Sequence, residues 1–385
     1  MTGPDECTRP GAARRAASRR RLAGVAALFV MAAAAAGCKD PVEPLPDDLQ
    51  VVWQGRAERG LSLVMSALTA KGDTLAPESV TWRVRPSSAG SWRGDTLRLE
   101  RAGRITVYAE HGREAGAVEI DVAVPPAILF DMVVDGNRDL YRAALDGRDL
   151  ERLTTHSAAD YDPTVAGKHV VFVSERDGNK ELYSLTLGGK EEKRLTYTAV
   201  SDVHPALSPD GRRLAFTRGM GLTRLHVAAP DASGAVRPDP THGHDGTLEN
   251  APAWSPDGRL LAFVSTAGGN PDLYLWDGET TTLLESTAGG EFEPAFSPDG
   301  RAIAFSSNRT GDVELYLLDL EDRSVRRLTE REGSDGYPSW LPDGRIVYVA
   351  YTGSTPELRW LDPAAPGVTH PIPLPGRPGN PVAMP

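Results

Sequence analysis

Residues 291–318 read EFEPAFSPDGRAIAFSSNRTGDVELYLL, and the same arrangement of residues recurs along most of the chain. A short apolar run follows Pro294, a Ser-Pro-Asp-Gly turn ends it, and two further apolar runs contain Phe305 and Tyr316. Proline presets the φ angle of the first central turn residue, and glycine accepts the left-handed conformation that closes a hairpin. The stretch therefore predicts consecutive antiparallel strands joined by tight turns.

Two anchor positions keep their spacing through six copies of this unit. Each copy has an aromatic residue in its second strand, 42 to 47 residues after the previous one: Phe130, Phe172, Phe216, Phe263, Phe305 and Tyr348. A second anchor, always preceded by leucine, follows ten or eleven residues later: Tyr141, Tyr183, His226, Tyr274, Tyr316 and Arg359. A proline-led inner strand and an outer strand, often Arg-Leu-Thr, complete the unit. Four-stranded units repeating at about 40–50 residues are typical of β-propeller blades. The sequence predicts a six-bladed β-propeller over residues 127–385.

The tight turns that follow the proline-led inner strands carry an aspartate that invites a functional interpretation. Ser-Pro-Asp-Gly occurs at 208–211, 255–258 and 297–300, and Leu-Pro-Asp-Gly occurs at 341–344. Aspartate is favoured in such turns because its side chain bonds nearby backbone groups. We therefore assign these acids a structural role and no catalytic one: Asp210, Asp257, Asp299 and Asp343.

The repeat resembles the TolB-type propeller repeat, and the resemblance covers about two-thirds of the chain. It implies a propeller fold, but the chain departs from TolB itself, whose N-terminal domain is α/β. Membership of the Tol–Pal envelope system therefore does not carry over. TolB-like propellers also precede peptidase domains in some hydrolases, and we expect no such domain after the sixth copy.

The two ends of the repeat region predict how the ring closes. The first copy starts at its second strand, because Pro125-Pro126 runs directly into the apolar residues 127–130. The last five residues, 381–385, look like the missing inner strand. We expect them to pair with strands from residues 127–154, since an open ring would expose a sheet edge.

Residues 49–125 predict a small β-sandwich ahead of the propeller. Short runs alternate apolar and polar residues, as in Val80-Thr81-Trp82 and Ile105-Thr106-Val107, and turn residues separate them. The order of these runs resembles bacterial immunoglobulin-like (Ig-like) domains. Such domains are mostly spacers or adhesion modules, and we interpret this one as a spacer. The predicted fold class is thus all-β, a six-bladed propeller preceded by a small Ig-like sandwich.

The first 37 residues read as an export signal. Five arginines between positions 14 and 21 precede an apolar run at 22–36, which is too short to span a bilayer. Ala35-Ala36-Gly37-Cys38 resembles a bacterial lipobox, although leucine is usual in place of Ala35. Cys38 would have no disulfide partner, because the only other cysteine, Cys7, lies in the segment to be removed. Simple signal-peptidase cleavage is the alternative, and residues 18–22 also look like a twin-arginine signal.

The predicted location follows from this signal. Residues 38–48 contain three prolines and several acids, and they predict an extended linker. We expect an exported protein, periplasmic or on the cell surface, lipid-anchored to a bacterial membrane. Removing residues 1–37 leaves 36 basic and 51 acidic residues, a net charge of −15. Such a body repels phosphate backbones, so nucleic-acid binding is not expected.

Candidate binding residues recur at one face of the predicted propeller, where the outer-to-inner connections lie. A carboxylate precedes the inner-strand proline by three residues in five copies: Asp160, Asp202, Glu249, Glu291 and Asp335. The residue directly before that proline approaches the central axis: Asp162, His204, Ala251, Glu293, Tyr337 or Asn380. A ring of acids would favour cations or basic peptides. Alternatively, the recurring acid accepts backbone N–H bonds within the loop that enters each blade.

Histidines gather in loops on this same face. The third connection is longer than the others and contains His242 and His244, while His156 and His204 lie in neighbouring connections. Imidazole and carboxylate are suitable metal ligands, but the spacing matches no familiar ligand motif. We therefore predict no metal and no cofactor. The sequence also has no nucleophile elbow, zinc-protease motif, phosphate loop or dinucleotide fingerprint.

Two functions remain open from the sequence. The first is a non-enzymatic envelope lipoprotein whose propeller face binds an unidentified envelope protein or polymer. The second is a propeller lyase or hydrolase that acts on a saccharide through the histidines and carboxylates at the channel mouth. Fold does not decide between them, because propellers serve many functions.

Overall fold

The computed structural model describes residues 48–189, 191–234 and 247–384. The predicted signal peptide, Cys38 and nearly all of the predicted linker lie outside these ranges, as do His242 and His244. Nearly all regular structure in the described ranges is strand, which confirms the all-β prediction. Those ranges contain no helix with the length and apolarity needed to cross a membrane.

Residues 50–122 form two antiparallel sheets. One has the order β1 (Gln50–Gln54), β2 (Ser62–Leu68), β5 (Thr96–Leu99) and β4 (Gly90–Arg93). The other has the order β3 (Thr81–Arg85), β6 (Gly103–His111) and β7 (Glu114–Val122), and two short 3-10 turns lie at Pro77–Ser79 and Ser87–Ala89. Alternate residues of both sheets, among them Leu63, Leu97 and Val107, are fully buried in one shared apolar cluster. The two sheets thus pack face to face as a sandwich.

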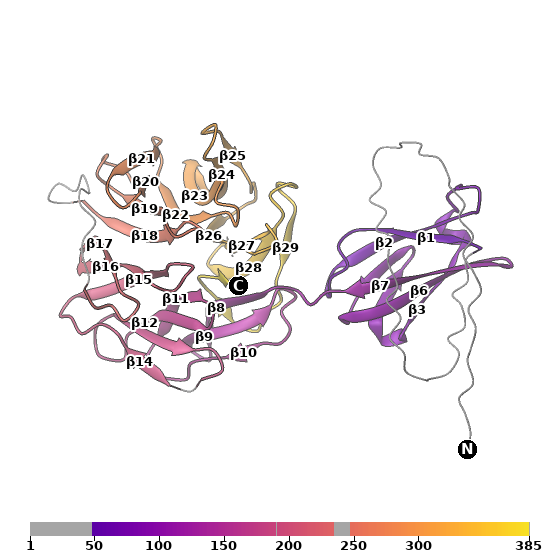
Figure 1. Ribbon diagram of the computed structural model, residues 1–385, viewed down its shortest axis with the longest axis horizontal. Helices are drawn as coiled ribbons and strands as arrows, with labels where there is room; N and C mark the ends of the chain where they lie inside the picture. The colour runs from indigo at the N-terminus through magenta and orange to yellow at the C-terminus, as the bar shows by residue number, and fades with distance from the viewer. Residues whose placement is uncertain (1–47, 190, 235–246, 385) are drawn as a thin grey trace, which may run out of the picture. The chain divides into compact units, whose positions relative to one another are not determined.

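The strands between Ala127 and Ala383 form six successive antiparallel sheets in the described part of the chain (Figure 1). The first contains β8 (Ala127–Val134), β9 (Asn137–Ala144) and β10 (Glu151–Arg152), joined by β30 (Arg377–Pro378) and β31 (Val382–Ala383). The second contains β11 (Asp160–Ala166), β12 (His169–Ser174), β13 (Glu181–Thr186) and β14 (Glu192–Arg194). The third contains β15 (Ser201–Leu207), β16 (Leu214–Met220) and β17 (Leu222–Ala228).

The remaining three sheets repeat the same four-stranded order. The fourth contains β18 (Glu249–Trp254), β19 (Leu261–Ser265), β20 (Asp272–Trp276) and β21 (Thr281–Glu285). The fifth contains β22 (Glu291–Phe296), β23 (Ala302–Thr310), β24 (Asp312–Asp319) and β25 (Val325–Arg327). The sixth contains β26 (Ser334–Trp340), β27 (Ile346–Thr352), β28 (Thr355–Leu361) and β29 (Thr369–Pro371).

The two anchor registers of the sequence are cross-strand partners in the structure. Phe172 pairs with Tyr183, Phe263 with Tyr274, and the other aromatic residues with their own anchors. In the first five sheets the two rings lie 5.6 to 6.3 Å apart between centroids. Such pairs stabilise a sheet through direct side-chain contact. The repeat therefore marks the middle of each sheet.

Apolar clusters join each sheet to the next. The leucine that precedes each second anchor lies in a cluster shared with the following sheet, as Leu182 does between the second and third sheets. Leu358 of the sixth sheet lies in a cluster with Phe130 of the first. The first and sixth sheets therefore pack together as the sequential neighbours do.

The C-terminal strand β31 lies beside β8, the first strand of the propeller region, in the first sheet. Val382 pairs with Leu129 and Ala383 with Ile128, and the Met384 N–H donates to the Ala127 carbonyl oxygen at 3.1 Å. β31 also lies beside β26 and β11, the inner strands of the sixth and second sheets. It thus takes the inner position that the first copy lacks.

The tight turns are held by their own aspartates. Asp299 accepts hydrogen bonds from the Ser297 hydroxyl at 2.6 Å and the Arg301 N–H at 3.1 Å, and Gly300 has a φ of 71°. Asp210 and Asp257 make the equivalent contacts, and Asp343 accepts from the Arg345 guanidinium group. The contacts of Asp210, Asp257 and Asp299 are those of turn residues.

Candidate functional site

A β-bulge in the inner strand of sheets two to six positions one residue of each at the centre of the six sheets. The register between the inner and second strands shifts across the inner-strand proline and the residue before it in sheets two to six. The residue before that proline is left-handed in each, with φ between 49° and 54°: Asp162, His204, Ala251, Glu293 and Tyr337. A bulge of this kind re-aims the side chain that it carries. All five line a central cavity of about 470 Å³, bounded by the inner strands.

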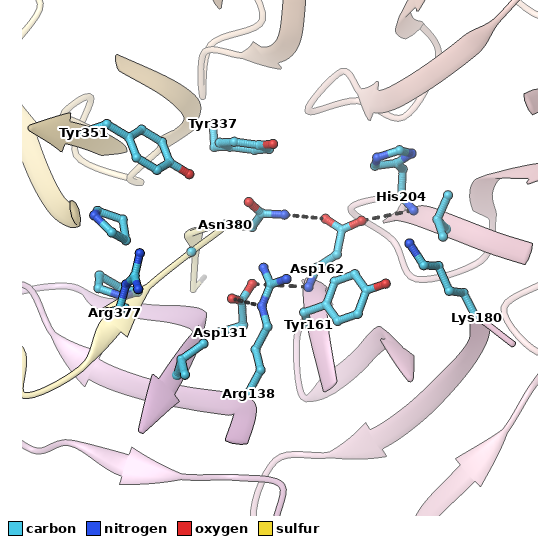
Figure 2. A pocket seen from close by; sticks show the side chains of 15 residues that line it. Asp131, Arg138, Tyr161, Asp162, Lys180, His204, Tyr337, Tyr351, Arg377 and Asn380 are labelled. Carbon is cyan, nitrogen blue, oxygen red and sulfur yellow. Dashed lines mark hydrogen bonds and ion pairs between the residues drawn. The ribbon is translucent and has the colours of Figure 1, made fainter. Parts of the chain in front are cut away.

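A second cavity of about 520 Å³ opens on the face that carries the outer-to-inner connections; we call it the mouth cavity (Figure 2). Its walls come from the first, second, third and sixth sheets. The labelled side chains around it are Asp131, Arg138, Tyr161, Asp162, Lys180, His204, Tyr337, Tyr351, Arg377 and Asn380. The cavity therefore collects residues from positions 131 to 380 at one place.

The two carboxylates of the mouth cavity already have partners. Asp131 accepts from Arg138 Nε at 2.6 Å and from the Asp162 N–H at 3.4 Å. Burial raises the pKa of Asp131, and the Arg138 guanidinium opposes that rise. Asp162 accepts from the His204 N–H at 3.0 Å and from Asn380 Nδ2 at 3.1 Å. Four polar groups of the protein thus occupy these two acids.

Glu293, in the central cavity, accepts a backbone N–H bond from the following sheet, as Asp162 does. It accepts from the Ser306 hydroxyl at 2.6 Å and from the Tyr337 N–H at 2.8 Å. Asp162 and Glu293 therefore each satisfy the bulge N–H of the following sheet. Burial raises the pKa of Glu293, and the Ser306 hydrogen bond opposes that rise. These bonds tie neighbouring sheets together at the centre.

The His204 ring is held beside its own sheet. Its Nδ1 lies 3.1 Å from Thr217 Oγ1, and the Thr217 hydroxyl lies 3.2 Å from the Val203 carbonyl oxygen. These contacts fix the ring next to β16, from which Thr217 comes.

Comparison with protein families identifies the fold. A family model described as the TolB beta propeller domain matches residues 126–238 and 241–358, more than half of the chain. The chain belongs to the TolB β-propeller family. No curated protein matches it in sequence.

Solved structures similar to this TolB-type propeller have varied functions. TolB from Acinetobacter baumannii matches with a TM-score of 0.59 and 16% identity, covering 87% of this chain and 82% of that one. A chain of a nidogen/laminin complex matches with a TM-score of 0.55 and 15% identity, and the match covers 67% of this chain and 97% of that one. Kuenenia stuttgartiensis hydrazine synthase matches with a TM-score of 0.55 and 14% identity, and the match covers 68% of this chain and 46% of that one. At such identities the likeness shows the fold alone.

The five recurring acids of this TolB-type propeller do not line either cavity. All five are fully buried: Asp160, Asp202, Glu249, Glu291 and Asp335. Four of them pair with an arginine at 2.6 to 3.2 Å, namely Arg176, Arg218, Arg309 and Arg331 in that order. Glu249 accepts from the Leu225 N–H at 2.9 Å. Of the two roles that the sequence left open, these contacts favour the structural one.

The histidines do not converge in the described residues. His156 Nδ1 accepts from the Ala158 N–H at 3.0 Å, as a loop residue does. No group of three or more His, Cys, Asp or Glu side chains placed to hold a metal ion occurs in the part of the chain that the structure describes.

Several mouth-cavity residues were missed by sequence reasoning. Lys180 and Tyr351 lie at second-to-third hairpins, which share this face with the outer-to-inner connections. Arg377 lies beyond the six copies, and Asp131 and Arg138 lie in the first copy, which has no inner strand of its own. The hairpin positions could have identified Lys180 and Tyr351 as residues of this face. That these residues meet around one cavity could not be predicted, because their proximity depends on how the six sheets are arranged around the centre.

Proposed function

We propose that the chain is a non-enzymatic cell-envelope lipoprotein whose propeller binds a protein or a polymer through the mouth cavity. The cavity supports this function because polar and aromatic side chains from four sheets converge there around about 520 Å³ of space. Concave sites with a few convergent polar groups are the usual places of ligand binding. Tyr337 is exposed at its rim, where an aromatic ring can contact a bound chain.

The proposed domain organisation has four parts. Residues 1–37 are an export signal, residues 38–48 a linker, residues 49–125 an Ig-like spacer, and residues 127–385 a six-bladed propeller closed by the C-terminal strand. The six successive sheets support the blade number. The four- and three-stranded sheets around one core support the Ig-like assignment. Export and an acyl anchor at Cys38 place the propeller in the periplasm or on the cell surface.

A site-directed cross-link tests the binding function. Tyr337 is replaced by p-benzoylphenylalanine, which keeps an aromatic ring at the cavity rim. The control carries the same group at Arg212, an exposed residue of the opposite face. We expect irradiation of intact cells to link one discrete partner to the Tyr337 variant and not to the Arg212 variant. Equal products from both positions, or none from Tyr337, would contradict the proposal.

The anchor has its own test. In the Cys38→Ser variant the acceptor thiol is absent, so a labelled fatty acid should not be incorporated and the protein should leave the membrane fraction. The Cys7→Ser variant is the matched control and should behave as the wild type does. Retention of the label after Cys38→Ser would exclude lipidation at this residue.

A further inference from the structure

The charges at the mouth cavity differ from those that the sequence suggests. The sequence predicts a ring of acids that attracts cations, yet the lining includes three cationic side chains and two carboxylates. Both carboxylates are occupied by the contacts of Arg138, Asn380 and two backbone N–H groups. A cationic ligand would meet acids whose four oxygens each already accept one hydrogen bond, and the Arg138 guanidinium offsets the charge of Asp131.

Two of the three cations retain most of their donors. No carboxylate in the described ranges bonds to the exposed Lys180 ammonium group, which lies 5.9 Å from the centroid of the Tyr161 ring. Arg377 is also exposed, and the one side-chain hydrogen bond that it makes in the described ranges runs from Nη2 to the Ser354 carbonyl oxygen at 2.8 Å. Figure 2 shows Lys180 and Arg377 on opposite sides of the cavity. The hydrogen-bonding groups of the mouth cavity that have no protein partner in the described part of the chain are therefore mainly the N–H donors of Lys180 and Arg377.

We propose that the mouth cavity binds a ligand carrying carboxylate groups, with Lys180 and Arg377 as its two charged contacts and Tyr337 and Tyr351 beside its apolar part. This inference rests on the proposed binding function and names the chemistry of the ligand. Arginine and lysine form strong charge-assisted hydrogen bonds with carboxylates. The carboxylates belong either to a glutamate- or aspartate-containing peptide segment or to a free polycarboxylate.

The acidic body of the protein does not prevent such binding. Charges farther away than about 8 Å are largely screened at physiological ionic strength, so the groups in the cavity decide the local interaction. The long-range repulsion instead slows the approach of anions. Neighbouring carboxylates are neutralised or hydrogen-bonded by protein groups, and Lys180 and Arg377 lack such compensation.

Titration calorimetry on the full-length chain tests this inference. The probes are acetyl-Glu-Glu-Glu-amide, its uncharged match acetyl-Gln-Gln-Gln-amide, and citrate. The test variant carries Lys180→Gln and Arg377→Gln. The control carries Lys168→Gln and Arg212→Gln, which remove the same charges from exposed positions on the opposite face. Neither variant removes a buried contact, so both should fold.

We expect the Glu peptide, citrate or both to bind, and the Gln peptide to bind at least about tenfold more weakly. The test variant should lose about tenfold or more in affinity, and the control should stay within about twofold. Binding of the Glu peptide alone would identify the ligand as a peptide segment, and binding of citrate alone would identify it as a free polycarboxylate. Absence of binding by both, or equal affinity in the test variant, overturns the inference.

The cross-link at Tyr337 separates this inference from the proposed function. A partner captured equally well when Lys180 and Arg377 are replaced leaves the binding function standing and contradicts the carboxylate contacts. Carboxylate binding that depends on these two residues, without any captured partner, supports the contacts and contradicts a macromolecular partner.

Discussion

At the residue scale, one backbone position is filled by five different side chains. The left-handed bulge residue is Asp162, His204, Ala251, Glu293 or Tyr337. Non-glycine residues adopt this conformation at a cost, and Asn and Asp tolerate it best. Asp162 and Glu293 offset part of the cost by bonding the next bulge N–H. The side chain of Ala251 has no polar atom that could accept the N–H of the next bulge residue.

Ala251→Asn should therefore stabilise the propeller. Asparagine favours the left-handed conformation, and its side-chain oxygen can accept from the Glu293 N–H as Asp162 accepts from the His204 N–H. We expect the free energy of unfolding to rise by about 1 kcal/mol, measured by urea denaturation. Ala253→Asn, two residues on at an ordinary φ, should give no such gain. A loss of stability in Ala251→Asn would contradict this role of the bulge.

Asp335 should make stability depend on pH. Burial raises the pKa of Asp335 to about 6, although Arg331 opposes the rise. Its Oδ2 has no hydrogen-bond partner in the described ranges. Between about pH 4 and pH 6 the native state binds a proton that the unfolded state does not, so stability falls as pH rises. The wild type should lose roughly 3 kcal/mol of unfolding free energy relative to Asp335→Asn across this window.

Asp299 supplies a control of opposite sign. The Ser297 hydroxyl and the Arg301 N–H lower the pKa of Asp299. The contribution of Asp299 to the free energy of unfolding is therefore fully present above the ordinary aspartate pKa. It is lost as pH falls through the pKa that Asp299 has in the folded state. Denaturation of Asp299→Asn beside the wild type at several pH values should show this reverse trend. Parallel curves for wild type and Asp335→Asn would show that Asp335 keeps an ordinary pKa.

At the element scale, one of the three two-residue strands of the first sheet has a large role. β31 holds only Val382 and Ala383, yet it pairs with β8 and lies against the inner strands on both sides. Ala383 and Met384 also pack against the apolar clusters of the first sheet. The element therefore joins the sheets on either side of the closure.

Deletion of residues 380–385 should strongly destabilise the propeller. It removes the pairing with β8, the Met384 contact and the Asn380 bond to Asp162, together roughly 3 kcal/mol or more. We expect a fall in melting temperature of at least about 5 °C. Hydrogen exchange should quicken more in β8 than in β19, which serves as the internal reference for the global loss of stability. An unchanged melting temperature would contradict closure by the tail.

At the whole-molecule scale, equivalent interfaces surround the centre. One apolar cluster joins each pair of neighbouring sheets, and the pair formed by the sixth and first sheets has one of its own. Leu182 and Leu358 occupy equivalent positions in two of these clusters and are both fully buried. Ring closure should therefore carry as much stability as a sequential contact.

Leu358→Ala and Leu182→Ala test this equivalence. Each creates a cavity at an interface between sheets, and each should cost about 2–5 kcal/mol. Because the ring is closed, the two losses should agree within about 1 kcal/mol, measured by chemical denaturation. A much smaller loss for Leu358→Ala would mean that the first and sixth sheets contribute little to each other.

The sequence by itself determined the repeating unit, because strand periodicity, tight-turn chemistry and anchor spacing are local properties of the chain. The pairing of Phe172 with Tyr183 and the turn role of Asp299 follow from residues a few positions apart. Which charges remain unmatched was decided only by the tertiary structure. Asp160 and Asp162 are near neighbours in sequence, yet one is buried against Arg176 and the other lines the mouth cavity. Lys180 and Arg377 face one cavity because the ring brings distant segments together, and no local pattern encodes that proximity.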